Sequence, residues 1–439
     1  MSADDLLASL HEILNRHESS AAKDRAILPN PPFFVGGEGA RIWDTAGREY
    51  IDLCSGAGVN SSGYGNKAVR EAAVAQLSAG LNHVGAMFVS PPKATLIEAI
   101  TSVMPSALTR VHLTVTGGEA IEAALKIARI RTGRHNMIAF WGAYHGRPQG
   151  ALGLTAHRAS RDPILPLSIG SAHFPYPYPY RNPWGFDPTD ADRICEMTLN
   201  YLDAALESPA SGLSPTAAVV VEPIQGVGGV VIPPAGFLSG LREICSRHDL
   251  LLIIDEIFCG FGKTGAWFGF ERDGVVPDLV VISKGFTGGF PVSAVVGTEE
   301  IMTSIPQGVQ STTFEGNPVI SAAAAANIEY LASIDAPARA RELHGYIERA
   351  LSEITAGCVG EVRGMGAMWG LEIVHPGSTA PDSHRAKQVQ ADSLRNGVLT
   401  YLGGYYGNVV GLIPPLVASR DDIDEGVSRV SAAIVNNAE

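Results

Sequence analysis

The chain has 439 residues, and their composition excludes several classes of protein. Hydrophobic residues make up 46% and charged residues 18%, which indicates a globular chain long enough for one large and one smaller domain. The net charge of −13 makes nucleic acids and anionic membranes poor partners, because an acidic surface repels phosphate. The five cysteines show no CxxC spacing, and neither a secretion signal nor a membrane span is recognisable. We therefore expect reduced thiols, no metal centre and a cytoplasmic location.

The first part of the chain predicts three kinds of local structure. Apolar residues at helical spacing predict an amphipathic helix over residues 4–18. The proline-rich stretch 28–34 is incompatible with a helix. Residues 40–53 show two alternating runs around a turn at 44–47, which is the pattern of a β-hairpin. We assign residues 1–65 to an N-terminal segment that packs with the smaller domain.

From residue 66 onward, helical segments such as 68–77 and 93–104 alternate with short apolar runs. The runs lie at 111–115, 137–140, 217–221, 251–255, 279–282 and 293–297. Runs that are apolar throughout indicate strands buried on both faces, and their alternation with helices predicts an α/β fold with a mostly parallel sheet. We expect this large domain to span residues 66–334 and to end with a helix at 321–334. Between these elements, the aromatic and proline-rich segment 174–188 predicts an extended loop.

The rest of the chain predicts a second, smaller domain. Residues 335–439 contain further helical patterns and a pair of strands near 362–374, which together indicate an α+β arrangement. The expected architecture is therefore a large α/β domain followed by a smaller α+β domain.

Three charged residues stand at the ends of apolar strands. Glu222 follows the run 217–221, Asp255 closes the next run, and Lys284 follows 279–282. Ligands of open parallel sheets bind beyond the carboxyl ends of the strands. Charged groups are expensive to bury there without partners, so three together favour a shared polar ligand. A partly desolvated lysine has a lowered pKa, and its neutral amine can attack a carbonyl. Asp255 would pair with a protonated ring nitrogen.

A glycine turn connects the run 111–115 to the next predicted helix. Gly117 and Gly118 leave backbone N–H groups open at a helix N-terminus, where a phosphate is favoured. Glu119 lies in the first turn of this helix, and Glu122 is expected to pair with Lys126 four residues later. The turn lacks the residues of a nucleotide-binding loop, so on its own it indicates only a phosphate site.

An aromatic segment, FWGAYHGR, follows the run 137–140. Tyr144 would stack on a flat ring, and Arg147 would bind a carboxylate through two hydrogen bonds. We expect His145 to support the site from behind.

Taken in order, these segments resemble the class III (ornithine/4-aminobutyrate type) aminotransferases, which depend on pyridoxal phosphate (PLP). The resemblance extends from Ile27 to Arg420, and the spacing of 29 residues between Asp255 and Lys284 is part of it. It implies PLP transferase fold type I. The segments that carry it are GARIWDTAGREYIDL, TGGEAIEAALKIARIRTGR, AFWGAYHGR, VVVEPIQGVGG, LLIIDEIFCGFGKTG, PDLVVISKG, TTFEGNP, VRGMGAMWGLE and IPPLV.

The resemblance implies a role for each matching residue. Lys284 would hold PLP as a Schiff base and move the proton of the reaction, and Asp255 would contact the pyridine nitrogen. Glu222 would order the site behind the cofactor. Thr313 would reach the phosphate of a neighbouring subunit, which implies a homodimer with shared sites, or a tetramer of such dimers. The implied cofactor contacts are Gly117, Gly118, Glu119, Tyr144, His145, Asp255, Ile257, Lys284 and Thr313.

Several positions depart from the family pattern on the substrate side. Val227 replaces a gating glutamate, and Gly411 replaces the arginine that binds an α-carboxylate. Loss of both predicts a smaller or less polar substrate pocket and poor use of glutamate, although Arg147 remains to bind one carboxylate. Phe258 replaces a glutamine that contacts the ring hydroxyl, so tuning of the cofactor is expected to differ.

The sequence favours an aminotransferase that moves an amino group between an amino acid or amine and a keto acid or aldehyde by a ping-pong mechanism. The PYPYPYR and GYYGNVVGLIPPLV segments also resemble the racemase and epimerase branch of the family. That branch needs an acid–base group opposite the lysine, where this chain has Val227. A third alternative is a catalytically silent partner subunit with the same fold, which Phe258, Val227 and Gly411 would suit.

Overall fold

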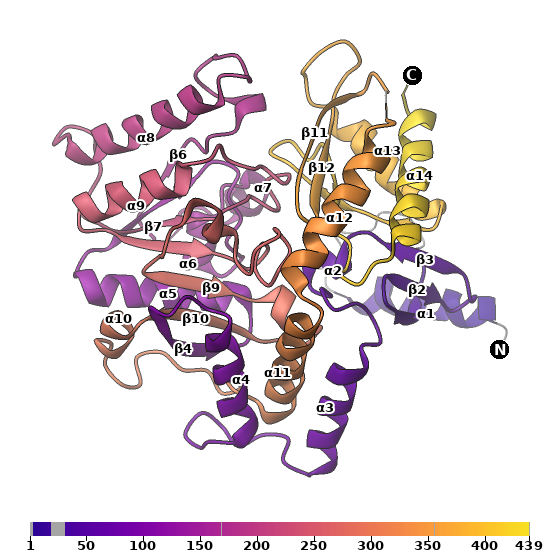
Figure 1. Ribbon diagram of the computed structural model, residues 1–439, viewed down its shortest axis with the longest axis horizontal. Coiled ribbons are helices and arrows are strands. Elements are labelled where there is room, and N and C mark those ends of the chain that lie inside the picture. Colours follow the sequence, from indigo (N-terminus) through magenta and orange to yellow (C-terminus); the bar gives the residue numbers. More distant parts are fainter. Residues whose placement is uncertain (1–2, 19–30, 168, 355, 439) are drawn as a thin grey trace.

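The computed structural model describes residues 3–18, 31–167, 169–354 and 356–438. It contains a large domain built on a seven-stranded sheet and a smaller domain beside it (Figure 1). No helix in the described ranges combines the length and the apolar character that crossing a membrane requires. The helix predicted at 4–18 is α1 (Ala3–His17), whereas residues 28–30 of the proline-rich stretch lie outside the described ranges.

The seven-stranded sheet confirms the predicted mixed α/β architecture. All of its strands run in the same direction except β10, which is antiparallel to both of its neighbours. The order across the sheet is β4 (Leu108–Thr114), β10 (Ser293–Thr298), β9 (Leu279–Ile282), β8 (Leu251–Asp255), β7 (Thr216–Val221), β5 (Asn136–Phe140) and β6 (Ser171–Phe174). Strand β6 was not predicted, and the segment 174–188 begins at its last residue.

Both faces of this sheet are buried, as the continuous apolar runs predict. On one face, Val219 and Val221 of β7 belong to the same core cluster as Phe237. On the other face, Val220 packs in a cluster with Ile121. Phe237 begins α9 (Phe237–Arg247), and Ile121 lies in α5 (Gly117–Thr132). The strands are therefore held between helical layers, and their ends are the natural place for polar groups.

The remaining helices of the large domain surround this sheet (Figure 1). Helix α11 packs against both α3 and α4, and α4 packs against β4 at the edge of the sheet. The helix predicted at 321–334 corresponds to α11, which begins at Pro318 and ends at Ser333. The bounds are α3 (Lys67–Ser78), α4 (Pro91–Ser102), α6 (Gln149–Leu154), α7 (Arg158–Arg161), α8 (Ala191–Glu207), α10 (Glu299–Thr303) and α11 (Pro318–Ser333).

The smaller domain contains the strand pair predicted near 362–374. Strands β11 (Val359–Met365) and β12 (Met368–Ile373) form a hairpin in a four-stranded antiparallel sheet with β15 (Val409–Leu412) and β14 (Tyr401–Gly403). Its helices are α12 (Ala336–Leu351), α13 (Ser383–Arg395) and α14 (Arg420–Asn436).

A second four-stranded sheet joins the two ends of the chain. Its order is β1 (Phe34–Glu38), β2 (Arg41–Asp44), β3 (Glu49–Asp52) and β13 (Val398–Leu399). Strands β2 and β3 form the predicted hairpin, and β3 pairs in parallel with β13. The N-terminal strands are therefore fixed to the C-terminal part of the chain. The short α2 (Ser55–Gly58) then leads back to the large domain.

Candidate active site

The carboxyl ends of β4, β5, β7, β8 and β9 meet at one edge of the large sheet, because these strands share one direction. A cavity of about 310 Å³ opens there. Most of the residues singled out in the sequence line it, although they come from five separate strand ends. The lining comprises Thr116, Gly117, Gly118, Tyr144, His145, Gly146, Arg147, Pro148, Glu222, Val227, Asp255, Ile257, Phe258, Ser283 and Lys284.

Asp255 and His145 form a buried pair at this edge. Asp255 Oδ2 lies 2.7 Å from His145 Nδ1, and Asp255 Oδ1 accepts a hydrogen bond from the Ile257 backbone N–H at 3.0 Å. Burial alone would lower the pKa of His145, but the hydrogen bond and charge of Asp255 outweigh it, and the pKa is raised. The carboxylate is therefore fixed in orientation by hydrogen bonds to both of its oxygens.

Glu222 connects two walls of the cavity. Its Oε1 accepts from the Tyr144 backbone N–H and its Oε2 from the Gly226 backbone N–H, both at 3.0 Å. Burial raises the pKa of this carboxyl to about 7, against the opposing effect of His145 and the two amides. The same side chain therefore positions Tyr144 on one side and the loop that carries Val227 on the other.

Lys284 begins the short 3₁₀ helix η5 (Lys284–Phe286), directly after β9 and Ser283. Its φ of 47° is left-handed, a conformation that non-glycine residues rarely adopt outside sites where the surrounding structure enforces it. The Nζ atom lies 4.1 Å from the centroid of the Phe258 ring. Burial lowers the pKa of Lys284 to about 8, although Asp255 and Glu222 act in the opposite direction. A substantial fraction of this amine is thus neutral at mildly alkaline pH.

The glycine turn forms a close-fitting cradle at the N-terminus of α5. A Cβ atom on Gly117 would lie 2.9 Å from Ile257 Cδ1, and one on Gly118 would lie 2.7 Å from Pro148 Cδ. Thr116 caps the helix by accepting from the Glu119 backbone N–H at 3.3 Å. Larger residues would close this part of the cavity, whereas glycines leave room for an anion at the helix N-terminus.

One expectation for the start of α5 is wrong. Glu122 does not pair with Lys126: it accepts from the backbone N–H groups of Gly150 and Ala151 in the first turn of α6, and Lys126 donates to Gln310. Open amides at a helix start attract a carboxylate more strongly than an exposed lysine does. Glu119 turns back to accept from the Val115 N–H at 3.0 Å and does not line the cavity.

Two further predicted residues lie outside the cavity lining. Thr313 is exposed, in the turn before α11. Gly411 lies buried in β15, paired with Tyr401 of β14. A Cβ atom on Gly411 would lie 3.3 Å from Tyr401 Cβ, so Tyr401 occupies the space beside this glycine.

Sequence reasoning missed a second buried lysine near the site. Lys263 is 1% exposed, and Glu256 on the same loop is fully buried. Both lie in the IDEIFCGFGKTG segment, which drew attention only through Asp255 and its neighbours. A lysine among glycines gives no signal of burial, so only the packing of the loop reveals it.

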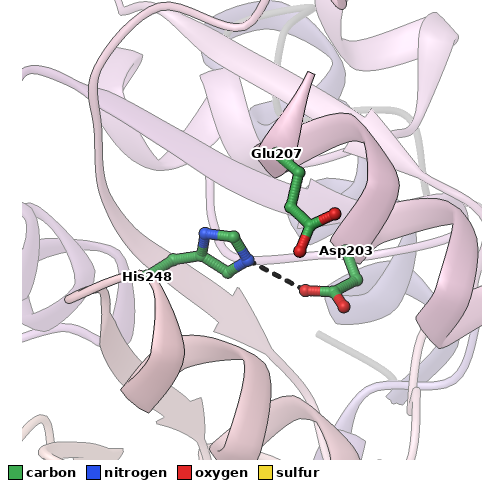
Figure 2. Close-up of side chains that lie close together, drawn as sticks. All are labelled: Asp203, Glu207 and His248. Atoms are coloured by element: carbon green, nitrogen blue, oxygen red, sulfur yellow. Dashed lines mark hydrogen bonds and ion pairs between the residues drawn. The ribbon is translucent and has the colours of Figure 1, made fainter. Parts of the chain in front are cut away.

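One group of metal-binding residue types lies far from the cavity. Asp203 and Glu207 of α8 approach His248, which follows α9, and their ligand atoms lie within 4.8 Å of one another (Figure 2). His248 Nε2 is 2.8 Å from Asp203 Oδ1, and Arg247 pairs with the other Asp203 oxygen. His248 precedes β8 in the chain and so lies near the amino end of that strand, whereas Asp255 is at its carboxyl end. We interpret this group as a surface ion-pair cluster.

Comparison with known proteins identifies the class of this chain. Residues 24–434 match the model of the class-III aminotransferase family. An acetylornithine aminotransferase of Methanopyrus kandleri is 37% identical over 404 residues, which cover 92% of this chain and 94% of that protein. A diaminobutyrate–2-oxoglutarate aminotransferase of Rhizobium meliloti is 32% identical, over 96% of this chain and 92% of that protein. The chain belongs to the class-III aminotransferase family.

Solved structures agree with this assignment. An (S)-enantioselective omega-transaminase from Thermomicrobium roseum matches with a TM-score of 0.91 and 28% identity, and each chain is covered completely. An amine transaminase from an uncultivated Pseudomonas species, in its PLP-bound form, matches with a TM-score of 0.87 and 29% identity over 96% of this chain and 98% of that chain. The protein is therefore a PLP-dependent aminotransferase of fold type I. The glycine cradle, the flanking Tyr144 and Ile257 and the buried Asp255 fit such a cofactor.

Proposed function

We propose that Lys284 binds PLP covalently through its Nζ and carries the proton that moves during amino-group transfer. The supporting observation is the position of this amine: it lines the cavity at the end of β9, and burial favours its neutral form. A neutral amine is required both to attack a carbonyl carbon and to accept a proton.

The remaining cavity residues would hold the cofactor. Gly117 and Gly118 would bind its phosphate at the N-terminus of α5, and Tyr144 and Ile257 would lie against its ring. Asp255, oriented by His145, would face the ring nitrogen and keep it protonated. The bound cofactor supplies an electrophilic carbon and an electron-withdrawing ring.

Glu222 and Lys284 complete the assignment of roles. Glu222 would hold Tyr144 and the Val227 loop in position through the backbone hydrogen bonds described above. Lys284 Nζ would take up a proton from the substrate and return it at a different atom. Val227 would face the substrate and offers no acid–base group for a second proton transfer, which supports transamination over racemisation.

Borohydride reduction of the holoenzyme followed by peptide mapping tests this assignment. Reduction should fix the cofactor on the peptide that contains Lys284. The variant Lys284→Ala should lose at least about 10⁴-fold in turnover, since it lacks both attachment and proton transfer. Lys126→Ala, which changes an exposed lysine on α5, serves as the control and should keep normal activity. A label on another lysine, or normal turnover by Lys284→Ala, would show that a different residue holds PLP.

We further propose that the donor is an amine or amino acid less polar than glutamate. The named relatives act on acetylornithine and diaminobutyrate, and the solved neighbours include an amine transaminase. In this chain Val227, Ile257 and Phe258 give the cavity an apolar side, and Arg147 supplies a guanidinium for one carboxylate. A donor screen that follows conversion of the cofactor to its amine form tests this proposal. Rapid conversion by glutamate would contradict it.

We also propose a homodimer with shared active sites. Met87, Phe88 and Val89 are 89%, 63% and 88% exposed, and Phe314 beside Thr313 is 60% exposed. Large apolar groups gathered on an exposed surface favour contact with another chain, and a second copy would bring Thr313 to its partner's PLP phosphate.

Subunit mixing tests whether the sites are shared. Lys284→Ala and Thr313→Asp chains should each have little activity, because one lacks the amine and the other repels phosphate. After random exchange, about one quarter of wild-type activity should return, since half of the dimers would then contain one intact site. No recovery despite heterodimer formation, checked with a mass tag on one chain, would contradict shared sites.

We retain the proposed division into residues 1–65, 66–334 and 335–439. The pairing of β3 with β13 supports the packing of the N-terminal segment with the smaller domain. We also propose a cytoplasmic location, which is supported by the five cysteines, all of them free thiols.

A further inference from the structure

Lys263 is a buried lysine to which the proposed function gives no role. It follows β8 by eight residues and is 1% exposed. Its Nζ makes one long hydrogen bond, 3.4 Å to the Gly260 carbonyl oxygen. Within the described parts of the chain, no carboxylate lies at ion-pairing distance from this amine. An amine without a counter-ion in such a place is expensive to protonate, so its location calls for an explanation.

The amine packs directly against the turn that carries Lys284. A Cβ atom on Gly285, the residue after Lys284, would lie 2.6 Å from Lys263 Nζ and 3.1 Å from Ser61 Oγ. Ser61 Oγ is buried and has no hydrogen-bond partner in the described chain. Asn327, which is fully buried, donates from its Nδ2 to the Gly285 carbonyl at 3.1 Å. Lys263 therefore lies behind the backbone that positions the cofactor-binding amine.

The surroundings of Lys263 favour its neutral form. Burial and the nearby charge of Lys284 lower the pKa of Lys263 to about 7, and the opposing effects of Cys259 and Glu256 are smaller. Burial raises the pKa of Glu256 to about 8, and one of its oxygens accepts from the Phe270 N–H at 3.0 Å. Glu256 is thus mostly uncharged at neutral pH and does not neutralise Lys263.

The groups that face Lys284 differ from those around Lys263. Asp255 and Glu222 favour the protonated form of Lys284, together with a weaker contribution from Cys259. Lys284 lines the same cavity as Asp255 and Glu222, whereas the hydrogen-bond partner of Lys263 Nζ is the neutral Gly260 carbonyl, so the environment of Lys284 favours an ammonium more strongly. Two adjacent buried amines that repel each other titrate as a coupled pair, and the one with fewer negative neighbours loses its proton first.

We propose that Lys263 is a positioning residue for Lys284 and that the two amines alternate in charge, with Lys263 neutral while Lys284 is an ammonium. On cofactor binding, the Lys284 ammonium would release one proton to solvent, and its neutral Nζ would form a C=N bond to the carbonyl carbon, whose oxygen leaves as water. Lys263 would then take up one proton from solvent. This inference rests on the proposed role of Lys284. The combined charge of the two amines would then change little between the cofactor-free and cofactor-bound states. An arginine at residue 263 would be charged in both states, and a methionine in neither.

Chemical labelling of the apoenzyme tests the coupling without any measurement of activity. Acetic anhydride labels neutral amines, and mass spectrometry gives the labelled fraction of Lys284 as a function of pH. The wild-type midpoint is expected near pH 8. Lys263→Arg should lower this midpoint by at least about 0.5 pH unit, which makes Lys284 roughly threefold more reactive at pH 7. Lys126→Arg is the control and should leave the midpoint unchanged. An unchanged midpoint in a folded Lys263→Arg chain would overturn the proposal.

Calorimetry of PLP binding provides a second measurement that does not depend on the arginine variant. Titrations in two buffers with different heats of ionisation give the number of protons taken up. At pH 7.5, Lys263→Met should take up about half a proton less per site than wild type. Equal uptake would rule out the alternating charge. Borohydride mapping of wild type, described above, separates this failure from a wrong choice of Lys284, because it gives the attachment site whatever the role of Lys263.

Discussion

Replacement of Glu222 by glutamine should change how the stability of this protein depends on pH. Burial raises the pKa of the Glu222 carboxyl from its ordinary value of 4.5 to about 7 in the folded chain. Between these pH values the folded chain holds a proton that the unfolded chain has released. The free energy of unfolding of wild type therefore decreases as pH rises through this window, and the contribution is constant above pH 7.

The size of the effect follows from the interval between the two pKa values. At about 1.4 kcal/mol per pH unit, an interval from 4.5 to about 7 corresponds to roughly 3 kcal/mol. Glutamine has no proton to release, so Glu222→Gln lacks this dependence. Its amide can accept from only one of the Tyr144 and Gly226 N–H groups, which costs about 1–3 kcal/mol at every pH. The change with pH is therefore the informative quantity.

Urea unfolding of the apoenzyme at pH 5 and pH 8 measures this change. The unfolding free energy of Glu222→Gln relative to wild type should rise by about 2–3 kcal/mol between the two pH values. Glu353→Gln, a change of an exposed carboxylate, is the matched control and should show the same difference from wild type at both. A constant difference for Glu222→Gln would refute the argument that folding leaves this carboxyl protonated up to neutral pH.

Three further changes test other parts of the structure. Asp255→Asn removes the charge beside His145, so the pKa of His145 should fall and kcat should drop about 10²–10³-fold; unchanged kcat would exclude a ring-nitrogen role for Asp255. Gly118→Ala places a Cβ atom 2.7 Å from a proline ring, and equilibrium dialysis should show PLP affinity reduced at least about tenfold, while Gly133→Ala at the far end of α5 retains it. Leu371→Ala empties a fully buried site in β12 and should lower the unfolding free energy by about 2–5 kcal/mol in urea titrations, with no change in PLP spectra.

The large sheet was predictable because its strands carry their own signal. Runs such as 217–221 and 279–282 are apolar at every position, and each is buried on both faces in the fold. Their carboxyl ends then place Glu222, Asp255 and Lys284 at one edge, which follows from parallel connectivity alone. Strand β6 lacked this signal, because its sequence SAHF is short and mixes polar with apolar residues. Its pairing with β5 in the fold is what identifies it as a strand.

Features that depend on distant contacts were not predictable from local patterns. The partners of Glu122 are backbone amides of α6, which follows β5 in the chain. The helical pattern around Glu122 contains no sign of these amides, so it predicted Lys126, four residues later, as the partner. The burial of Lys263 comes from segments far along the chain, since its carbonyl accepts from the Ala367 N–H and its amine meets Gly285. The position of Thr313 relative to a phosphate depends on a second chain and stays a prediction.

The buried ionisable groups around the cavity show where charge is retained. Burial raises the pKa of Glu222 and Glu256 and lowers that of Lys284 and Lys263, so each of these four groups is driven toward its neutral form. The pair of Asp255 with His145 is different, because there a carboxylate lies 2.7 Å from an imidazole whose pKa is raised. The hydrogen-bonded pair of Asp255 and His145 is therefore placed where it would face the pyridine nitrogen, while burial lowers the pKa of the amine that must react. A fold that buried all six groups as matched ion pairs would lose this distinction, since Lys284 would then be locked as an ammonium.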